Sequence, residues 1–566
     1  LCYYNGDGVE PAPKVAAAWF RKAAEQGDSD AQNELGVRFA NGDGVRKSWV
    51  QAVQWYRQAA EQGNVFGQYN LAWRCYNGQG TEESPEQAAE WFRKAAEQGY
   101  ADAQNELAIR YANGDGVEQS WEQAVYWYRK AAEQGNSNSQ YWLARCYSTG
   151  QGVEQDQGQA TAWYRRAAER GIAGAQNELG IHYANGYGVE QDWEQAIYWY
   201  RKAAESGNAC SQNNLAWLYF NGQGVEQSFE EAVYWFEKAA TRGYVDAQNI
   251  LGVCYANGQG VEQNWEQAVY WYRKAAEQGD RYGQSNLSWC CYNGQGTDRS
   301  PEESAVWLER AAGQGDNDAQ NVLGIRYANG DGVEQEQERA VYWYRKAAED
   351  GLSCAQYNLS LCYYNGNGVE RSLETSAFWL RKAAEQGNSD AQNILGVCYA
   401  NGEGVEQDWE QAVYWYRKAA EQGQCVGQRN LSRCFYNGEG VSRSLEESIF
   451  WLRKSAEQGY ADAQNDLGVR YANGDGVEQN REQAVYWYRQ AAEQGHMYAQ
   501  YNLGTYYANG CGIPQSWDLA AYWFGLSAEQ GYAEAQRSLA DCYEKGRGVP
   551  KDLNRAAQLL RQANGR

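Results

Sequence analysis

Cysteine and histidine are the residues of this 566-residue chain that could supply nucleophiles, redox groups or metal ligands. Only two histidines are present, His182 and His496. They occupy different positions of the sequence pattern, so metal clusters and nucleophile–histidine pairs lack parts. Eight of the 14 cysteines share one recurring position, which arginine fills elsewhere: Cys2, Cys146, Cys254, Cys290, Cys362, Cys398, Cys434 and Cys542, against Arg38, Arg110, Arg326 and Arg470. Because a disulfide partner would not be exchanged for arginine, we expect free thiols in helices, which favours a reducing compartment such as the cytoplasm.

Other groups that resemble reactive or ligand-binding motifs have simpler structural roles. The Asn-Gly-Asp-Gly loops lack the distal glutamate of a calcium loop, and Gly-x-Gly here follows a helix, whereas a nucleotide fingerprint follows a strand. The adjacent Cys290 and Cys291 point to different faces of a helix. Paired glutamates stand around expected helix N-termini, where they complement the helix dipole: Glu82/Glu83, Glu302/Glu303 and Glu446/Glu447. We therefore predict no catalytic residue, no cofactor and no metal site.

A strict sequence period must position all of these residues. Gly-x-Gly returns every 36 residues, sixteen times from Gly6/Gly8 to Gly546/Gly548, without insertion or deletion. Such a period is typical of an array in which each repeat contacts only its neighbours. We predict an all-α fold, an α/α superhelical solenoid of about fifteen 36-residue helix-turn-helix repeats. The array is expected to span residues 1–566 as a single domain, with a truncated first repeat (1–27) and a last repeat (about 532–566) that acts as a cap.

Each repeat contains signals for two helices. In one example, Ala103, Leu107 and Tyr111 form an apolar stripe, and Ser120 offers an N-cap to a second helix. Equivalent N-cap residues recur at Ser48, Asp156, Asp192, Ser228, Asn264, Asp408 and Asn480, and proline follows the cap at Pro85 and Pro301. Tryptophan fills one position of the second helix in fifteen repeats, from Trp19 to Trp523, and Leu559 replaces it in the last. We expect this indole to pack between neighbouring repeats.

The overall composition excludes several classes of partner. The net charge is −23, so the surface would repel a nucleic-acid duplex or an anionic bilayer, and no nucleic-acid partner is expected. No stretch of about 18 apolar residues is present, so we expect no insertion into a membrane. Aromatic residues make up 14% of the chain, which argues against disorder. The chain starts at Leu1 in mid-repeat, which suggests a truncated or processed N-terminus.

The repeat resembles the Sel-1-like repeat family. That family's pattern stands here as Leu251-Gly252, Tyr255, Gly258, Gly260 and Val261, followed by Ala268 and the run from Trp271 to Gly279. The resemblance covers essentially the whole chain. It implies a right-handed α/α superhelix related to tetratricopeptide arrays, whose members usually act as adaptors that assemble protein complexes. Fold follows from such a resemblance more firmly than function does.

One cysteine-rich branch of that family joins each second helix to the next repeat by a disulfide, and some of its members bind or cleave β-lactams. This chain departs from that branch. Cys210 and Cys354 lie near the start of a first helix, but the preceding helix ends in Ala203/Ala204 and Ala347/Ala348. Because the disulfide cannot form there, neither the chemistry nor the secreted setting of that branch is expected here.

Repeats of two types alternate, so the true period is 72 residues. The resemblance places first helices on a concave wall, and the helical wheel puts two positions of each first helix opposite the Ala/Leu/Tyr core stripe. Asparagine amides there could bond an extended peptide, and Tyr, Trp and Arg are common binding anchors. The candidate partner-binding residues are Asn33, Tyr69, Trp73, Asn105, Tyr141, Arg145, Asn177, Asn213, Trp217, Asn249, Trp289, Asn321, Tyr357, Asn393, Arg429, Arg433, Asn465 and Tyr501. The alternative is that these side chains pack against adjacent first helices.

These features favour a non-catalytic scaffold or adaptor that binds a partner protein or extended peptide on its concave face, within a larger complex or alone. Two other functions remain open. The array could be a structural spacer or a filament-forming segment of a larger assembly. It could also be a β-lactam-binding or thiol enzyme, which the missing histidines and disulfides disfavour.

Overall fold

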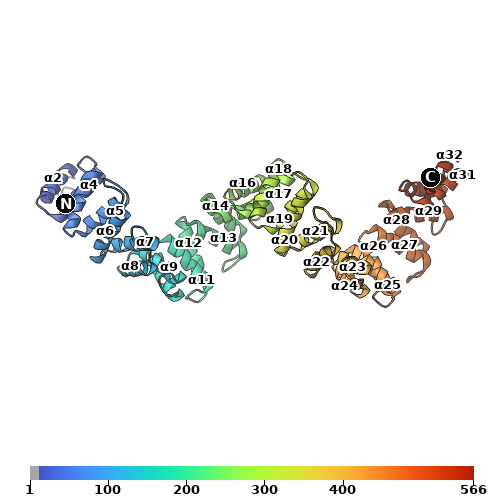
Figure 1. Cartoon of the computed structure of the whole chain (residues 1–566), viewed down its shortest axis with the longest axis horizontal. Coiled ribbons are helices and arrows are strands. Elements are labelled where there is room, and N and C mark those ends of the chain that lie inside the picture. The colour runs from blue at the N-terminus through green and yellow to red at the C-terminus, as the bar shows by residue number, and fades with distance from the viewer. Residues whose placement is uncertain (1–11, 566) are drawn as a thin grey trace. The chain divides into compact units, whose positions relative to one another are not determined.

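The computed structural model describes residues 12–565, and within them every regular element is an α-helix. Residues 1–11 of the predicted truncated repeat lie outside the described residues, and with them Cys2 and Gly6/Gly8. The chain divides into two compact units, Leu1–Asp280 and Arg281–Arg566, called here the N-terminal and C-terminal units. In each unit, helices follow one another in pairs along the sequence (Figure 1). The predicted all-α solenoid is confirmed.

The helices of the N-terminal unit are α2 Pro13–Glu25, α3 Ser29–Asn41, α4 Trp49–Glu61, α5 Val65–Tyr76, α6 Pro85–Glu97, α7 Ala101–Asn113, α8 Trp121–Glu133, α9 Ser137–Thr149, α10 Gln157–Glu169, α11 Ala173–Asn185, α12 Trp193–Glu205, α13 Ala209–Asn221, α14 Phe229–Thr241, α15 Val245–Asn257 and α16 Trp265–Glu277. Odd-numbered helices are the first helices of repeats and even-numbered helices are the second.

The same order continues in the C-terminal unit. Its helices are α17 Arg281–Asn293, α18 Pro301–Gly313, α19 Asn317–Asn329, α20 Gln337–Glu349, α21 Ser353–Asn365, α22 Leu373–Glu385, α23 Ser389–Asn401, α24 Trp409–Glu421, α25 Cys425–Asn437, α26 Leu445–Glu457, α27 Ala461–Asn473, α28 Arg481–Glu493, α29 Met497–Asn509, α30 Trp517–Glu529, α31 Ala533–Lys545 and α32 Leu553–Ala563.

Local signals set the helix boundaries as the sequence predicts. The Ser120 hydroxyl accepts the backbone N–H of Gln123 and so caps α8. Asp192 and Asn264 cap α12 and α16 in the same way. Most first helices end at a glycine in the left-handed conformation, such as Gly114 with φ +80°. The predicted N-caps and glycine stops are confirmed.

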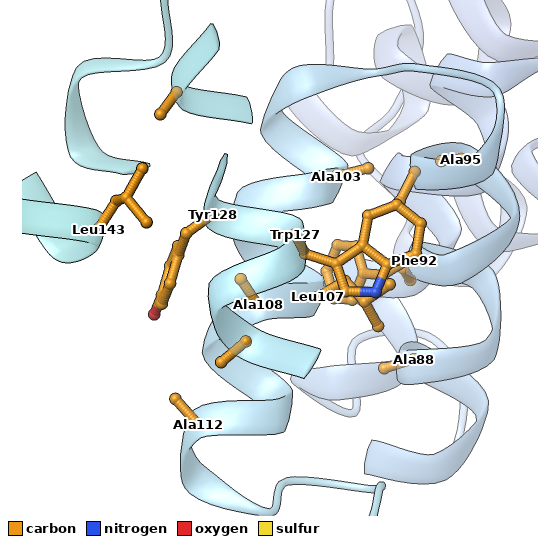
Figure 2. Packing of buried hydrophobic residues seen from close by; sticks show 14 of the residues in the cluster. Ala88, Phe92, Ala95, Ala103, Leu107, Ala108, Ala112, Trp127, Tyr128 and Leu143 are labelled. Carbon is orange, nitrogen blue, oxygen red and sulfur yellow. The ribbon is translucent and has the colours of Figure 1, made fainter. Parts of the chain in front are cut away.

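Two aromatic residues of each second helix fill different seams. Figure 2 shows the Trp127 ring of α8 lying toward Phe92 of α6, the second helix of the preceding repeat. The Tyr128 ring points the other way, toward Leu143 of α9. Both are buried. The predicted packing of the recurring tryptophan between repeats is therefore confirmed for this repeat, and the equivalent Trp199, Trp271 and Trp415 are also buried. Trp19, in the first described helix, departs from the prediction because it is 59% exposed.

One residue of each first helix faces the Tyr128 position of the second helix. The pair of residue types at these two positions differs between repeats. A Cβ added to Gly36 or Gly396 would stand 2.6 or 2.7 Å from the ring of Tyr56 or Tyr416, so glycine is paired with tyrosine there. In three repeats of the C-terminal unit, serine takes the glycine position and leucine the tyrosine position: Ser288 with Leu308, Ser360 with Leu380 and Ser432 with Leu452. All six are buried. In these three repeats a larger residue at the first position accompanies a smaller one at the second, whereas Ala108 and Ala144 stand opposite Tyr128 and Tyr164.

Buried glutamines join successive repeats. The side-chain amide of Gln104 donates to Ala96 O (3.0 Å) in the preceding repeat. Its side-chain oxygen accepts from Gln134 (2.7 Å), which ends α8. The same side-chain bond recurs at nine other places, for example from Gln98 to Gln68 and from Gln422 to Gln392. Where the donor glutamine is replaced, the acceptor oxygen is buried without a partner, at Gln140, Gln176, Gln212 and Gln320.

This pattern predicts that Ser206→Gln stabilises the seam between α11 and α12. The new amide would reach the orphaned oxygen of Gln176, because the residues stand in the same relation as Gln134 and Gln104. We expect a gain of about 1 kcal/mol in the local free energy of opening. Hydrogen exchange followed by mass spectrometry measures that quantity in an array that does not unfold as one unit. Gln134→Ser is the matched control and should lower protection around Gln104. Unchanged exchange in both variants would contradict the proposed role of the glutamines.

Candidate protein-interaction surface

The eighteen predicted binding residues all lie on first helices, and the structure separates them into buried and accessible groups. The surface that the odd-numbered helices present within each unit is called the first-helix face. Its accessible residues decide what the molecule can bind, because buried side chains cannot reach a partner without rearrangement.

The predicted position of the asparagines is wrong. All eight are buried between neighbouring first helices, with exposed fractions of 4–8%. The Asn33 oxygen accepts from the Asn70 amide of the next repeat (2.9 Å), and the Asn105 oxygen accepts from the Ser139 hydroxyl (2.8 Å). Equivalent bonds reach Asn177, Asn321, Asn393 and Asn465, and Asn213 and Asn249 are buried likewise. Adjacent first helices approach so closely that this position belongs to their seam, and six of the eight asparagines link repeats by these bonds.

The four tyrosines at the same position in the alternate repeats are half-buried. Tyr69 packs edge-to-face against Phe92 and Tyr100, with ring centroids 5.7 and 5.1 Å apart. Tyr501 makes the corresponding contacts with Phe524 and Tyr532. Burial raises the pKa of Tyr69, and also that of Tyr141 and Tyr357, so these phenols stay neutral. Each tyrosine supports the seam and leaves only part of its ring at the surface.

The second predicted position, four residues further along, is the accessible one. Trp73 and Trp217 are half-buried, each with one edge against a phenylalanine of the following second helix (Trp73–Phe92, 5.7 Å; Trp217–Phe236, 5.5 Å). Trp289 is 51% exposed. Arg145 and Arg433 are exposed, and Arg145 stacks on Trp142 with 5.0 Å to the ring centroid. In the alternate repeats this position is aliphatic, as at Ile325, which is 38% exposed.

Acidic residues on the first-helix face were not singled out from the sequence. Glu106 and Glu178 are half-buried, and burial raises the pKa of both carboxyls while Arg110 and Arg145 oppose the rise. Asp466 stands at the same position in a later repeat and accepts from Arg429. Their signal is the position directly after the seam residue, which a helical wheel places about 100° further round the helix.

The thiols of the described residues form no disulfide and are mostly buried. Burial raises the pKa of Cys254 to about 11 and that of Cys434 to about 12, so these thiols stay protonated and are poor nucleophiles. Within residues 12–565, no three His, Cys, Asp or Glu side chains gather in a group that could hold a metal ion. None of the described helices combines the length and apolar character needed to cross a bilayer.

Tandem helix pairs, glycine stops and a shared seam of indoles and glutamines define a tetratricopeptide-like α/α solenoid repeat protein. The Sel1 repeat model matches residues 1–28, 29–64, 65–100, 101–136, 137–172, 173–208, 211–244, 245–280, 281–316, 317–352, 355–388, 389–424, 426–460, 461–496, 498–532 and 533–564. The chain belongs to the Sel1 repeat family. Proteins of this kind generally mediate protein–protein interactions and are mostly non-catalytic scaffolds.

One solved structure of similar sequence and fold agrees with this assignment, and a second is reported for its sequence similarity alone. A protective antigen of uropathogenic Escherichia coli with an SLR fold is 37% identical, with a TM-score of 0.67, and the match covers 79% of this chain and 97% of the antigen. A Sel1 repeat protein from Oxalobacter formigenes is 31% identical over 58% of this chain and 92% of its own, with a TM-score of 0.47. No curated protein matched the sequence.

Proposed function

We propose that this protein is a non-catalytic scaffold that binds a partner protein or an extended peptide on its first-helix face. The observation that carries the proposal is the accessible position occupied by Trp73, Arg145, Trp217, Trp289 and Arg433. Large aromatic and arginine side chains are the usual anchors of protein interfaces. The helix pairs do not require them there, because Leu361 and Thr505 fill the same position in other repeats. The net charge of −23 disfavours nucleic acid as the partner.

The experiment compares two triple variants of the full-length protein as bait for proteins of its native host. Trp73, Trp217 and Trp289 are changed to alanine in the first variant. Tyr198, Tyr234 and Tyr270 are changed in the second, because these are 47–49% exposed but belong to second helices. We expect the first variant to lose its partner by roughly 30-fold or more, since one anchor contributes about 2 kcal/mol. The second variant should bind like the parent protein.

Circular dichroism and hydrogen exchange must show that both variants keep their helices, since Trp73 and Trp217 also contact the following helices. Loss of the partner in the tyrosine variant alone would assign binding to the second helices. Equal retention in both variants would leave no binding role for the tryptophans and would favour a spacer.

A further inference from the structure

A pocket of about 280 Å³ opens on the first-helix face of the C-terminal unit, between α25 and α27. Its lining includes Arg429, Arg433 and Tyr436 from α25, Asp466 and Arg470 from α27, and Leu452 from the intervening α26. Leu452 stands where most repeats have tyrosine or phenylalanine, as at Tyr416. The smaller side chain leaves space beside the arginines that a ring would occupy.

Two of the three arginines in the pocket already have carboxylate partners. Arg429 donates from Nε to Asp466 Oδ2 (2.8 Å), and its Nη1 lies 3.5 Å from Asp462 Oδ2. Arg470 stacks on the Tyr436 ring, 3.4 Å from its centroid, and reaches Asp475 only at 3.8 Å. The Nε of Arg470 is buried and has no hydrogen-bond acceptor. The Nε of Arg110, which stands at the same position of another repeat, is buried without an acceptor as well, so this feature belongs to the packing of that position.

Arg433 is the third arginine and differs from the other two. It is exposed at the pocket, and no carboxylate among the described residues pairs with it. The lining therefore holds three arginines and one aspartate, although the protein as a whole is strongly acidic. An unpaired guanidinium at the mouth of a pocket is suited to a planar anion, because its N–H groups can bond both oxygens of a carboxylate.

The corresponding place in the N-terminal unit provides a natural comparison. Arg145 occupies the position of Arg433, and Glu178 that of Asp466, but Tyr141 replaces Arg429. One arginine there faces one carboxylate, and Arg145 lowers the pKa of Glu178 against the effect of burial. His182, bonded to Thr161, takes the position of Arg470. That place has no surplus guanidinium, so the arginine excess is specific to the α25–α27 pocket.

We propose that the α25–α27 pocket binds a carboxylate group of the partner, with Arg433 as its main contact and with Tyr436 and Val469 beside the adjoining methylenes. The proposal deepens the proposed function and rests on it. The carboxylate belongs either to an aspartate or glutamate side group or to the free C-terminus of a polypeptide. A neutral or basic segment would leave the Arg433 guanidinium without an anionic partner.

Ligand-observed saturation-transfer NMR on the full-length protein tests the proposal with three small probes. These are N-acetylglutamate N-methylamide, its neutral glutamine analogue, and N-acetyl-alanyl-alanine with a free C-terminus. We expect at least one acidic probe to bind roughly tenfold or more tightly than the glutamine analogue, with affinity that falls as salt rises. The acidic probe that binds better identifies the source of the carboxylate.

Arg433→Leu should abolish this preference and keep the fold, because Leu361 stands at the equivalent position of another repeat. Arg310→Leu, at an exposed arginine of the second helix α18, is the control and should leave probe binding unchanged. Equal binding of the acidic and neutral probes, or an unchanged preference in Arg433→Leu, would overturn the carboxylate site. If the tryptophan variant still loses its partner in that case, the first-helix face keeps its function and only the pocket assignment fails.

Discussion

Changing Gly116 to alanine is expected to destabilise the junction between α6 and α8 by roughly 2–5 kcal/mol. Gly116 has φ +71°, which costs an alanine about 1–2 kcal/mol. An added Cβ would also stand 2.1 Å from the carbonyl oxygen of Pro85, the first residue of α6. That atom belongs to the backbone of the preceding repeat and cannot rotate away, so the repeats would have to separate. The second glycine of most described Gly-x-Gly pairs lies as close to the preceding repeat, so this position sets the distance between repeats.

Gly99→Ala is the matched control for Gly116→Ala. Gly99 has φ +93°, but an added Cβ would meet no atom within 4 Å. Its replacement should cost only the backbone strain of about 1–2 kcal/mol. Hydrogen exchange of α6, α7 and α8 measures both effects in the full-length protein. Equal losses of protection would show that close approach at Gly116 contributes nothing.

Exchanging the Gly396–Tyr416 pair for serine and leucine is expected to restore most of the stability that either single change removes. Gly396→Ser alone places a side chain against the Tyr416 ring and should cost about 1–3 kcal/mol. Tyr416→Leu alone leaves a cavity at a fully buried position and should cost roughly 2–4 kcal/mol. The double variant reproduces the pair that Ser432 and Leu452 form two helices further on. A coupling energy of about 1–3 kcal/mol follows.

Hydrogen exchange of α23 and α24 measures this coupling energy. The measurement compares the parent, the two single variants and the double variant. The serine hydroxyl in the double variant can bond the carbonyl oxygen of residue 412, as Ser432 bonds Ser448 O at 2.7 Å. Additive losses, with no coupling, would show that the Ser–Leu and Gly–Tyr pairs are independent choices. They would also contradict the idea that the smaller side chain of Leu452 leaves the space beside the arginines of the α25–α27 pocket.

Helices and their ends could be predicted because their causes are local. Ser120 caps α8 through a residue three positions away, and Gly114 stops α7 by its own backbone conformation. The burial of Trp127 followed from a position that recurs in fifteen repeats. Each of these features depends on the repeat itself or on one neighbour, so the period supplied most of the structural information.

The candidate site could be predicted only in part, because it depends on how closely neighbouring helices approach. A helical wheel separates a core stripe from the opposite side, but it does not show that Asn33 lies in the seam with the next first helix. The position of Trp73 lies slightly further round the helix and stays accessible. The arginine pocket depends on Leu452, which is 19 residues from Arg433 and belongs to another helix. Its arginines were visible in the sequence, but the space between them was not.

The most direct test of the central claim is hydroxyl-radical footprinting of the full-length protein with and without its captured partner, followed by mass spectrometry of each tryptophan and tyrosine. Partner binding to the first-helix face predicts slower oxidation at one or more of Trp73, Trp217 and Trp289, with unchanged oxidation at Tyr198, Tyr234 and Tyr270. Protection of the tyrosines alone, with the three indoles as reactive as in the free protein, would contradict the claim that this face binds the partner.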